Sequence, residues 1–338
     1  MSSGSSSTSE LFGLTIQGGS CEEILAWAFS ANQTGPRWIV TANPEILLEA
    51  KRNASYAAVL RQADYLSVDG MGLFLALRSV SRPVSRVTGV ALAEALIERA
   101  AQTNLCVGFI GGDPGVAEEA GAYWRTRYPS LKVITEEGGK VQSDGSGDLA
   151  EEEALHRLVL AAPDLLFVAF GGGGTKQESW IAKRVGDIPS LKIVVGVGGA
   201  FDFWSKRIRR APGVLQRLGL EWAWRLIQEP RRIKRILRAT VVFPIVFFVD
   251  QVRRPGFGRT RMLQLLMLAV RLLFFLLILC PALFVYLRAV FREGLRKYDW
   301  RFSDLIVPLV IIGVIYPILS FILRIKQELS DLYDKSGS

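Results

Sequence analysis

Cysteine and histidine are scarce in this chain of 338 residues. The three cysteines, Cys21, Cys106 and Cys280, lie far apart, and no C-x-x-C pair occurs. A disulfide framework and a zinc or dithiol site are therefore excluded, and a reducing compartment is favoured. The single histidine, His156, lies in a charged stretch with no nucleophile motif beside it, which indicates a surface side chain rather than a metal ligand or catalytic group.

The common fingerprints of nucleotide and metal sites are absent as well. The glycines within 108–115 follow an apolar run, but their spacing is not G-x-G-x-x-G, and Gly174-Thr175-Lys176 is not the G-K-[S/T] of a phosphate loop. No D-x-D triplet occurs, which removes a common way of holding a divalent metal on a nucleoside diphosphate. The sequence therefore predicts no metal and no cofactor, and charge on a bound diphosphate would be met by Arg, Lys and helix N-termini.

Positive charge is concentrated in one segment. The chain has a net charge of +9, and residues 203–261 alone contain 15 Lys and Arg against 3 acidic residues. The most basic run, Arg231 to Arg238, lacks the interleaved aromatics of a nucleic-acid stacking surface and leads into apolar sequence. These features favour anionic lipids or phosphate groups as partners and argue against nucleic acid.

The segment 11–202 has the pattern of an α/β domain. Residues 1–10 are Ser-rich and have neither the basic nor the apolar region of a signal peptide, so we expect a disordered start in the cytosol. Helical periodicity over 44–62 and 90–102 alternates with short apolar runs, which predicts a largely parallel, Rossmann-like sheet. The predicted strands are 38–40, 65–68, 106–110, 165–170 and 193–197.

The last third of the chain has the composition of a membrane-associated region. Residues 203–261 form a basic helical appendage in which Trp lies beside Arg, as at a membrane interface. Residues 262–323 then contain two long apolar stretches, which predict a hydrophobic hairpin with both ends cytoplasmic, followed by a polar tail, 324–338. Insertion of these helices in the membrane plane, without crossing, stays open because Arg271 interrupts the first stretch.

Three groups of candidate ligand-binding residues follow predicted strands, where open α/β sheets bind ligands. Asp69 ends one strand and could serve as a general base, although an aspartate before Gly70 equally suits a turn or a helix cap. Asn43 precedes Pro44 and also suits a helix N-cap. Gly111 and Gly112 could present backbone N–H groups to phosphate, or could simply permit a tight turn.

The order of motifs along residues 11–238 resembles the WecG/TagA/CpsF family of glycosyltransferases. No single motif is specific, but nine in family order make chance similarity very improbable. The motifs are Thr41-Ala-Asn-Pro-Glu, Asp69-Gly-Met-Gly, Arg86-Val-Thr-Gly, Gly111-Gly-Asp-Pro-Gly, Lys176-Gln-Glu-Ser-Trp, Gly196-Val-Gly-Gly-Ala-Phe-Asp, Arg210-Ala-Pro, Leu220-Glu-Trp and Glu229-Pro-Arg-Arg.

The resemblance implies a GT-E-like body and a metal-independent, inverting enzyme. Such an enzyme moves a sugar from a UDP-sugar to a polyprenyl-diphosphate-linked saccharide during assembly of a bacterial surface polysaccharide. By position, Asp69 matches the family's general base, which removes the proton of the acceptor hydroxyl. The residues implied in substrate binding are Thr41, Asn43, Arg86, Gly111, Gly112, Gln177, Glu178, Arg210, Arg225, Arg231 and Arg232.

Two departures from the family pattern limit what can be carried over. Thr175, after four glycines, stands where the family usually has proline, so contacts of this loop to the nucleotide are less secure. The apolar extension goes beyond the family's usual end, which implies anchoring at the cytoplasmic face of the bacterial inner membrane. For Arg231 and Arg232, attraction to anionic lipid headgroups is as good an explanation as binding of the substrate diphosphate.

Several functional questions stay open at this point. N-acetylmannosamine, its uronic acid, glucose and glucuronic acid all occur as donor sugars in the family, and no residue decides among them. A non-catalytic, membrane-anchored scaffold that binds nucleotide sugars is the alternative to an enzyme. The oligomeric state is also open, because apolar surface could be buried against a second subunit or against lipid.

Overall fold

The computed structural model describes residues 8–31, 35–80, 84–171, 175–217, 221–229 and 232–253, all within one compact unit. Arg231, the predicted hydrophobic hairpin 262–323 and the predicted tail 324–338 lie outside these residues. Among the helices that are described, none has the length and apolar character needed to span a bilayer.

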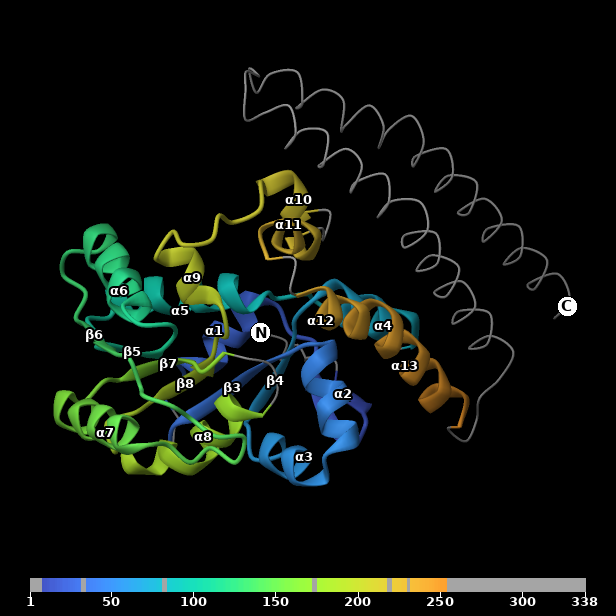
Figure 1. Cartoon of the computed structure of the whole chain (residues 1–338), viewed down its shortest axis with the longest axis horizontal. Coiled ribbons are helices and arrows are strands. Elements are labelled where there is room, and N and C mark those ends of the chain that lie inside the picture. Colours follow the sequence, from blue (N-terminus) through green and yellow to red (C-terminus); the bar gives the residue numbers. More distant parts are fainter. Residues whose placement is uncertain are drawn as a thin grey trace, which may run out of the picture. The chain divides into compact units, whose positions relative to one another are not determined.

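An eight-stranded sheet forms the centre of the molecule (Figure 1). Only the β1–β2 pair is antiparallel, and every other pairing is parallel, which confirms the predicted α/β fold with a mostly parallel sheet. The strands in sheet order are β1 (Thr8–Leu11), β2 (Leu14–Gln17), β4 (Tyr65–Val68), β3 (Arg37–Ala42), β8 (Ile193–Gly196), β7 (Leu165–Ala169), β5 (Val107–Gly111) and β6 (Val133–Glu136).

The five predicted strands are all present, with ends within two residues of the predicted ones. Their apolar runs are continuous because β3, β4, β5, β7 and β8 are covered on both faces. We predicted that residues 1–10 are disordered. This prediction is wrong for Thr8–Glu10, which belong to β1. Leu11, Leu14 and Ile16 are buried, and this apolar surface holds the β1–β2 hairpin on the sheet.

Helices cover both faces of the sheet, with a separate hydrophobic core on each side. Along β3, Trp38 and Val40 face the first core, whereas Ile39 faces the second. The first core is covered by α2 (Pro44–Arg52), α3 (Ala54–Leu60), α4 (Met71–Val80), α7 (Leu149–Ala161), α8 (Lys176–Arg184) and α13 (Phe243–Val252). The second is covered by α1 (Cys21–Ala28), α5 (Gly89–Gln102), α6 (Val116–Arg127) and α9 (Ala200–Trp204).

The predicted helix over 44–62 is two helices, because Asn53 interrupts it. Asn53 has an extended backbone, ends α2, and accepts a hydrogen bond from the backbone N–H of Tyr56 at 3.1 Å, which caps α3. Asparagine competes with the helix through such local hydrogen bonds and favours the N-cap position. The break turns α3 toward α8 and brings Tyr56 into the core.

Replacing Asn53 by alanine should lower the free energy of unfolding by about 1 kcal/mol, because the N–H of Tyr56 loses its acceptor. Asn53→Asp keeps an acceptor oxygen at the same position and is the matched control. Urea unfolding of the detergent-purified chain measures both. Equal stability of Asn53→Ala and the parent would contradict the capping role.

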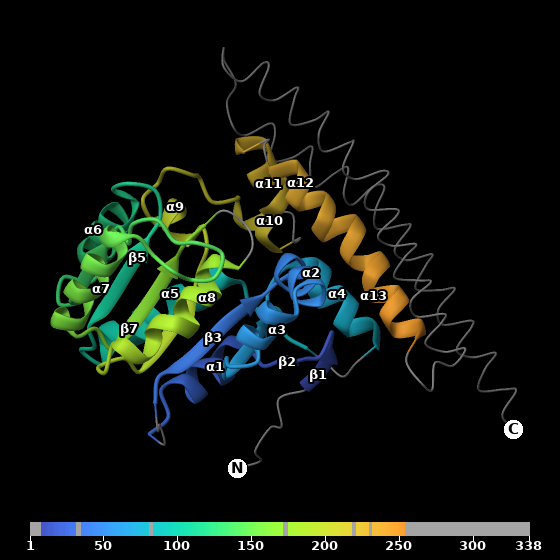
Figure 2. The same cartoon turned by 60° about the horizontal axis from the view of Figure 1, so that its bottom comes forward.

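The segment after α9 packs back onto the body. It contains α10 (Gly213–Arg217), α11 (Glu221–Gln228), α12 (Ile233–Leu237), a π-helical turn (Arg238–Val242) and α13. Phe243 and Phe247 on one face of α13 are buried in the first core, and α13 lies beside α2 and α4 (Figures 1 and 2). The described part of the predicted appendage, 203–261, that follows α9 is residues 205–217, 221–229 and 232–253, and we call these residues the appendage.

Candidate functional site

The predicted site residues gather at the carboxyl edge of the sheet. The segments that leave the adjacent strands β3 and β8 lead to α2 and α9, which cover opposite faces. Open α/β sheets bind ligands at such a switch point. Within the described ranges, no three His, Cys, Asp or Glu side chains are grouped as they would be around a metal ion.

Asp69 lies directly after β4 and is partly buried. Its carboxylate accepts hydrogen bonds from the backbone N–H of Gly70, at 2.6 Å, and of Gly89, the first residue of α5. Desolvation raises the pKa of Asp69 to about 6, and the charge of Glu221 acts in the same direction, whereas the two N–H groups and Arg86 oppose it. Asp69 is thus an isolated carboxylate that is ionised at neutral pH and still basic enough to accept a proton.

Thr41 lies near the end of β3, and Asn43 directly follows that strand. The buried Thr41 hydroxyl donates to the carbonyl of Gly196 at the end of β8, at 3.3 Å. Asn43 is the N-cap of α2, where its side-chain oxygen accepts from the N–H groups of Glu45 and Ile46 at 3.0 and 3.1 Å. The hydrogen bonds of both residues are thus made within the protein, where they fix the ends of β3 and β8 and the start of α2.

The glycines after β5 form a tight turn. Gly111 and Gly112 have φ of 99° and 86°, and a Cβ on Gly111 would meet the carbonyl oxygen of Ala169 at 2.8 Å. The N–H of Gly112 donates to that same carbonyl, and Glu137 accepts from the N–H of Gly115 at the start of α6. The prediction that Gly112 offers its N–H to a phosphate is therefore corrected, because this donor is already used within the protein.

Gln177 and Glu178 begin α8 and lie under the end of β8. The Gln177 side chain accepts from the N–H of Gly198 at 3.0 Å and donates to Glu178 at 2.8 Å. Glu178 is 3% exposed and also accepts from the hydroxyl of Tyr56 at 3.0 Å, and burial raises its pKa. The predicted contact of Glu178 with a nucleotide is corrected, since its carboxylate is enclosed and holds Gln177 against the glycine turn after β8.

Arg86 and Arg210 line one cavity of about 430 Å³ beside the Asp69 loop. Arg86 donates to the backbone carbonyl of Gln216 at 3.2 Å, and Arg210 forms an ion pair with Glu94 of α5 at 2.8 Å. The other residues of the lining are Ser20, Cys21, Ser85, Val87, Thr88, Ala91, Gln216 and Glu221. The structure therefore places Arg210 with Arg86 rather than with the other appendage arginines.

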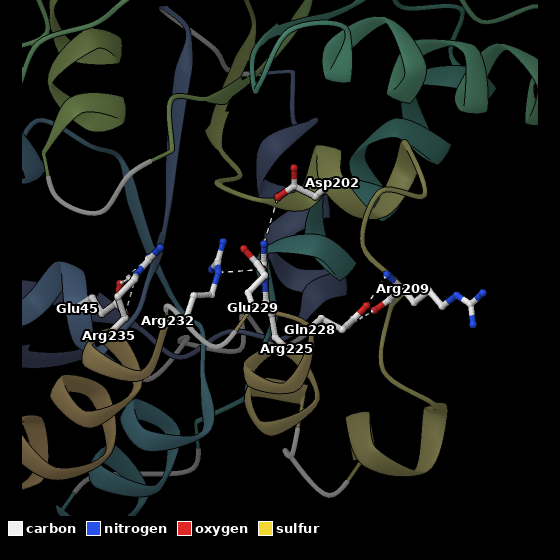
Figure 3. A network of polar contacts seen from close by, with 8 residues as sticks. All are labelled: Glu45, Asp202, Arg209, Arg225, Gln228, Glu229, Arg232 and Arg235. Carbon is white, nitrogen blue, oxygen red and sulfur yellow. Dashed lines mark hydrogen bonds and ion pairs between the residues drawn. The ribbon is translucent and has the colours of Figure 1, made fainter. Parts of the chain in front are cut away.

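Arg225 and Arg232 lie in a separate polar network at the end of β8 (Figure 3). Both donate through Nε to the same oxygen of Glu229, each at 2.9 Å, and Arg225 also forms an ion pair with Asp202 at 3.2 Å. Desolvation and repulsion from Arg225 lower the pKa of Arg232. Two guanidinium groups held side by side on one carboxylate are suited to bind a diphosphate in a bidentate manner.

The arginine network also attaches the appendage to the body. Arg225 lies against Gly199, and a Cβ at this position would displace its guanidinium. Arg235 forms a bidentate pair with Glu45 of α2 at 2.6 to 3.1 Å, whereas Gln228 exchanges hydrogen bonds with the backbone of Arg209 within the appendage (Figure 3). The ends of β3 and β8 are thereby linked to α11 and α12.

Three acidic residues of this site were not predicted from the sequence. Glu221 lines the cavity, whereas Asp202 and Glu229 hold the appendage arginines. Each lies in a motif that supported the family resemblance, but the motif alone does not show which arginine the acid contacts. The sequence does contain one indication of them. Few acidic residues lie among many arginines in this segment, so each acid could have been predicted to pair with an arginine.

Known proteins are similar to the chain over most of the described region. The model of the "Glycosyl transferase WecG/TagA/CpsF family" matches residues 9–256. A Bacillus spizizenii protein named N-acetylglucosaminyldiphosphoundecaprenol N-acetyl-beta-D-mannosaminyltransferase is 33% identical over 207 residues, which cover 61% of this chain and 77% of the relative. A Staphylococcus aureus protein of the same name is 32% identical over 210 residues, with coverages of 62% and 79%.

The matched region includes the carboxyl edge of the sheet, Asp69, the cavity and the arginine network. The nine motifs quoted above also lie within it, which confirms the resemblance found in the sequence. The chain therefore belongs to the WecG/TagA/CpsF family of glycosyl transferases.

Proposed function

We propose that this enzyme transfers an N-acetylmannosamine-type hexose from a UDP-sugar to a saccharide linked to a polyprenyl diphosphate, with inversion at the anomeric carbon. The observation that carries the proposal is the carboxylate of Asp69 at the end of β4, near the cavity that Arg86 and Glu221 line. The names of both relatives support this choice of sugar and acceptor over glucose or a uronic acid. The product would enter a bacterial cell-surface polysaccharide.

The proposed reaction is a single displacement. Asp69 accepts the proton of the acceptor hydroxyl while that oxygen attacks the anomeric carbon of the donor. The bond from the anomeric carbon to the diphosphate oxygen breaks on the opposite side, so that UDP leaves and the configuration inverts. The proton passes from Asp69 to solvent in the next step, which restores the base.

Positive charge from the protein would stabilise the leaving diphosphate. Arg225 and Arg232 are fixed side by side, and their Nε groups are occupied by Glu229 while other guanidinium N–H groups remain for a ligand. Arg235 adds positive charge near the end of β3, although Glu45 pairs with it. Preorganised donors of this kind act where charge develops in the transition state.

We further propose that the appendage faces the cytoplasmic side of the bacterial inner membrane. Its outer surface exposes the apolar side chains Leu237, Val242, Ile245, Val249 and Val252. Arg238 and Lys234 lie on the same helical segment, and a basic amphipathic surface favours anionic lipid. This position would hold the site beside a lipid-linked acceptor at high local concentration.

The proposal is tested by UDP release from the detergent-purified full chain. A panel of UDP-sugars is combined with a short-chain prenyl diphosphate that carries N-acetylglucosamine, in the presence of EDTA. We expect release that depends on the acceptor and is strongest with UDP-N-acetylmannosamine. Activity that requires a divalent metal, or UDP binding without turnover for every pair, would contradict the proposal and would favour the scaffold.

The pH dependence of kcat/KM should show an acid limb near pH 6. Asp69 must be ionised to accept a proton, and its pKa of about 6 means that activity falls as the pH drops through that value and levels off at about pH 7 and above. Initial rates over a pH range with constant ionic strength measure the limb. A flat profile through pH 6 would contradict the role of Asp69 as base.

A further inference from the structure

The cavity beside Asp69 is built from the body and from the appendage. Ser20 and Cys21 start α1, and the segment 85–88 leads into α5, where Thr88 is the N-cap. The opposite wall comes from the appendage, through Arg210, Gln216 and Glu221. The N–H of Ser85 donates to the carbonyl of Gly18 at 2.9 Å, so the two body segments are held together.

The accessible surface of the lining is mostly apolar with a few polar groups, which suits a small uncharged ligand such as a sugar ring. It combines side-chain hydroxyls with Arg86, Arg210 and Glu221, and Arg210 is already neutralised by Glu94. One positive and one negative side chain then remain, so the wall has no excess of charge that would select an anion. A volume of about 430 Å³ lies in the lower part of the range for ligand pockets, which fits one or two sugar rings better than a nucleotide sugar.

Glu221 is the appendage residue that connects the cavity with the base. Its Oε1 lies 3.8 Å from Nε of Arg210, and neither atom has a hydrogen-bond partner within the described protein. The side chain remains 24% exposed, and the cavity is the space it borders. Glu221 and Arg86 are also the two charged side chains that act on Asp69.

We propose that this cavity binds the sugar of the acceptor, and that Glu221 is a positioning residue that orients it toward Asp69. The inference rests on the proposed function, because it takes Asp69 as the base that accepts the proton of the acceptor hydroxyl. Asp69 is not part of the lining, but the lining residues Val87 and Thr88 lie beside it, because the N–H of Val87 donates to Val68 at 2.9 Å and the N–H of Gly89 donates to Asp69. The arginine network around Asp202 is left for the donor diphosphate. The carboxylate of Glu221 would accept a hydrogen bond from one hydroxyl of the acceptor.

Cys21 allows occupancy of the cavity to be measured without turnover. It lines the cavity as a free thiol, and it becomes the only cysteine in a Cys106→Ser, Cys280→Ser variant. Burial and the charge of Glu22 raise the pKa of the thiol, so alkylation by iodoacetamide is followed at mildly alkaline pH. We expect the prenyl-diphosphate N-acetylglucosamine to slow alkylation several-fold, and UDP-sugar alone to have little effect.

The opposite pattern, protection by UDP-sugar and not by the acceptor, would overturn the assignment of the cavity. Because labelling requires no catalysis, it separates this inference from the proposed function. If the chain shows no turnover but the acceptor still protects Cys21, the proposed transferase function is rejected and the assignment of the cavity to the acceptor sugar stands. Turnover without protection would keep the enzyme and reject the site.

Glu221→Gln should raise the KM for the acceptor about tenfold and leave the KM for the UDP-sugar within about twofold, since one charge-assisted hydrogen bond is lost. It should also move the acid limb of kcat/KM to lower pH, because the charge of Glu221 raises the pKa of Asp69. Glu98→Gln, on the exposed side of α5, makes the same chemical change away from the cavity and is the control.

A purely structural role of Glu221 would lower the amount of folded protein without a selective change in the acceptor KM or in the pH profile. A rise confined to the UDP-sugar KM would instead assign the cavity to the donor sugar. Either result overturns the inference.

Discussion

Replacing Asp69 by asparagine should lower kcat by a factor on the order of 10²–10⁴, the range expected when a general base is lost. The amide has nearly the same shape, and its oxygen can still accept from the N–H groups of Gly70 and Gly89, so the loop after β4 should keep its conformation. UDP binding should therefore be retained. Initial rates and calorimetric titration with UDP, on the same preparation, measure the two effects.

Asp64→Asn is the matched control for this substitution. Asp64 lies at the opposite end of β4, where its carboxylate accepts from the backbone N–H of Trp38 at 2.8 Å, and an amide oxygen can replace that contact. We expect its kcat to remain within about twofold of the parent. Full activity in Asp69→Asn would reject the base and leave Asp69 as a turn residue.

The same variant should be more stable than the parent at alkaline pH. Asp69 has a pKa of about 6 in the folded chain and an ordinary value of 3.8 when unfolded, so its ionisation disfavours the folded state. This loss in the free energy of unfolding is absent below about pH 4, grows between pH 4 and pH 6, and reaches up to about 3 kcal/mol above pH 6. Urea unfolding at about pH 8 and pH 4 should show a gain only at the higher pH.

Loss of activity together with a gain in stability would distinguish a functional carboxylate from a structural one. Asparagine caps a helix about as well as aspartate, so for a residue that only caps, the substitution should leave the stability nearly unchanged at both pH values. A desolvated base instead reduces the stability of the fold and is retained for its chemistry. Unchanged stability of Asp69→Asn at pH 8 would therefore support the capping interpretation that the sequence left open.

The sequence predicted the central strands well and the outer strands poorly. β3, β4, β5, β7 and β8 are buried on both faces, so each appears as a continuous apolar run. β6 lies at an edge, all its residues are only partly buried, and it includes Thr135 and Glu136, which weakens that signal. β1 and β2 have four residues each and alternate in burial, too short a pattern to separate from a loop.

The candidate site was predictable where a residue acts through its position at a strand end. Asp69 directly follows β4, a predicted strand, and Arg86 lines the cavity. The surroundings of Glu178 depend on Tyr56, which is 122 residues away in sequence, and no local pattern reports such a contact. The same reason hid the partners of the appendage arginines, since Arg210 pairs with Glu94 and Arg225 with Asp202 across the fold.

Arg225→Gln should lower kcat/KM about 100-fold, because it removes a charged donor that we place at the developing diphosphate. The side chain is only 18% exposed, and its loss also leaves Asp202 without its cationic partner. Reduced activity alone would therefore fit either a catalytic role or a weakened attachment of the appendage. The partner substitution Asp202→Asn separates these explanations.

If Arg225 serves mainly to attach the appendage, breaking the ion pair from either side should have a similar effect, and Asp202→Asn should be nearly as inactive as Arg225→Gln. If Arg225 binds the diphosphate, Asp202→Asn should retain activity within about fivefold, because it removes only a carboxylate that competes with the ligand for the same guanidinium. The double variant should then match Arg225→Gln. Equal losses in both single variants would reject the diphosphate role, whereas the asymmetric result would show that Asp202 occupies part of the anion site in the absence of substrate.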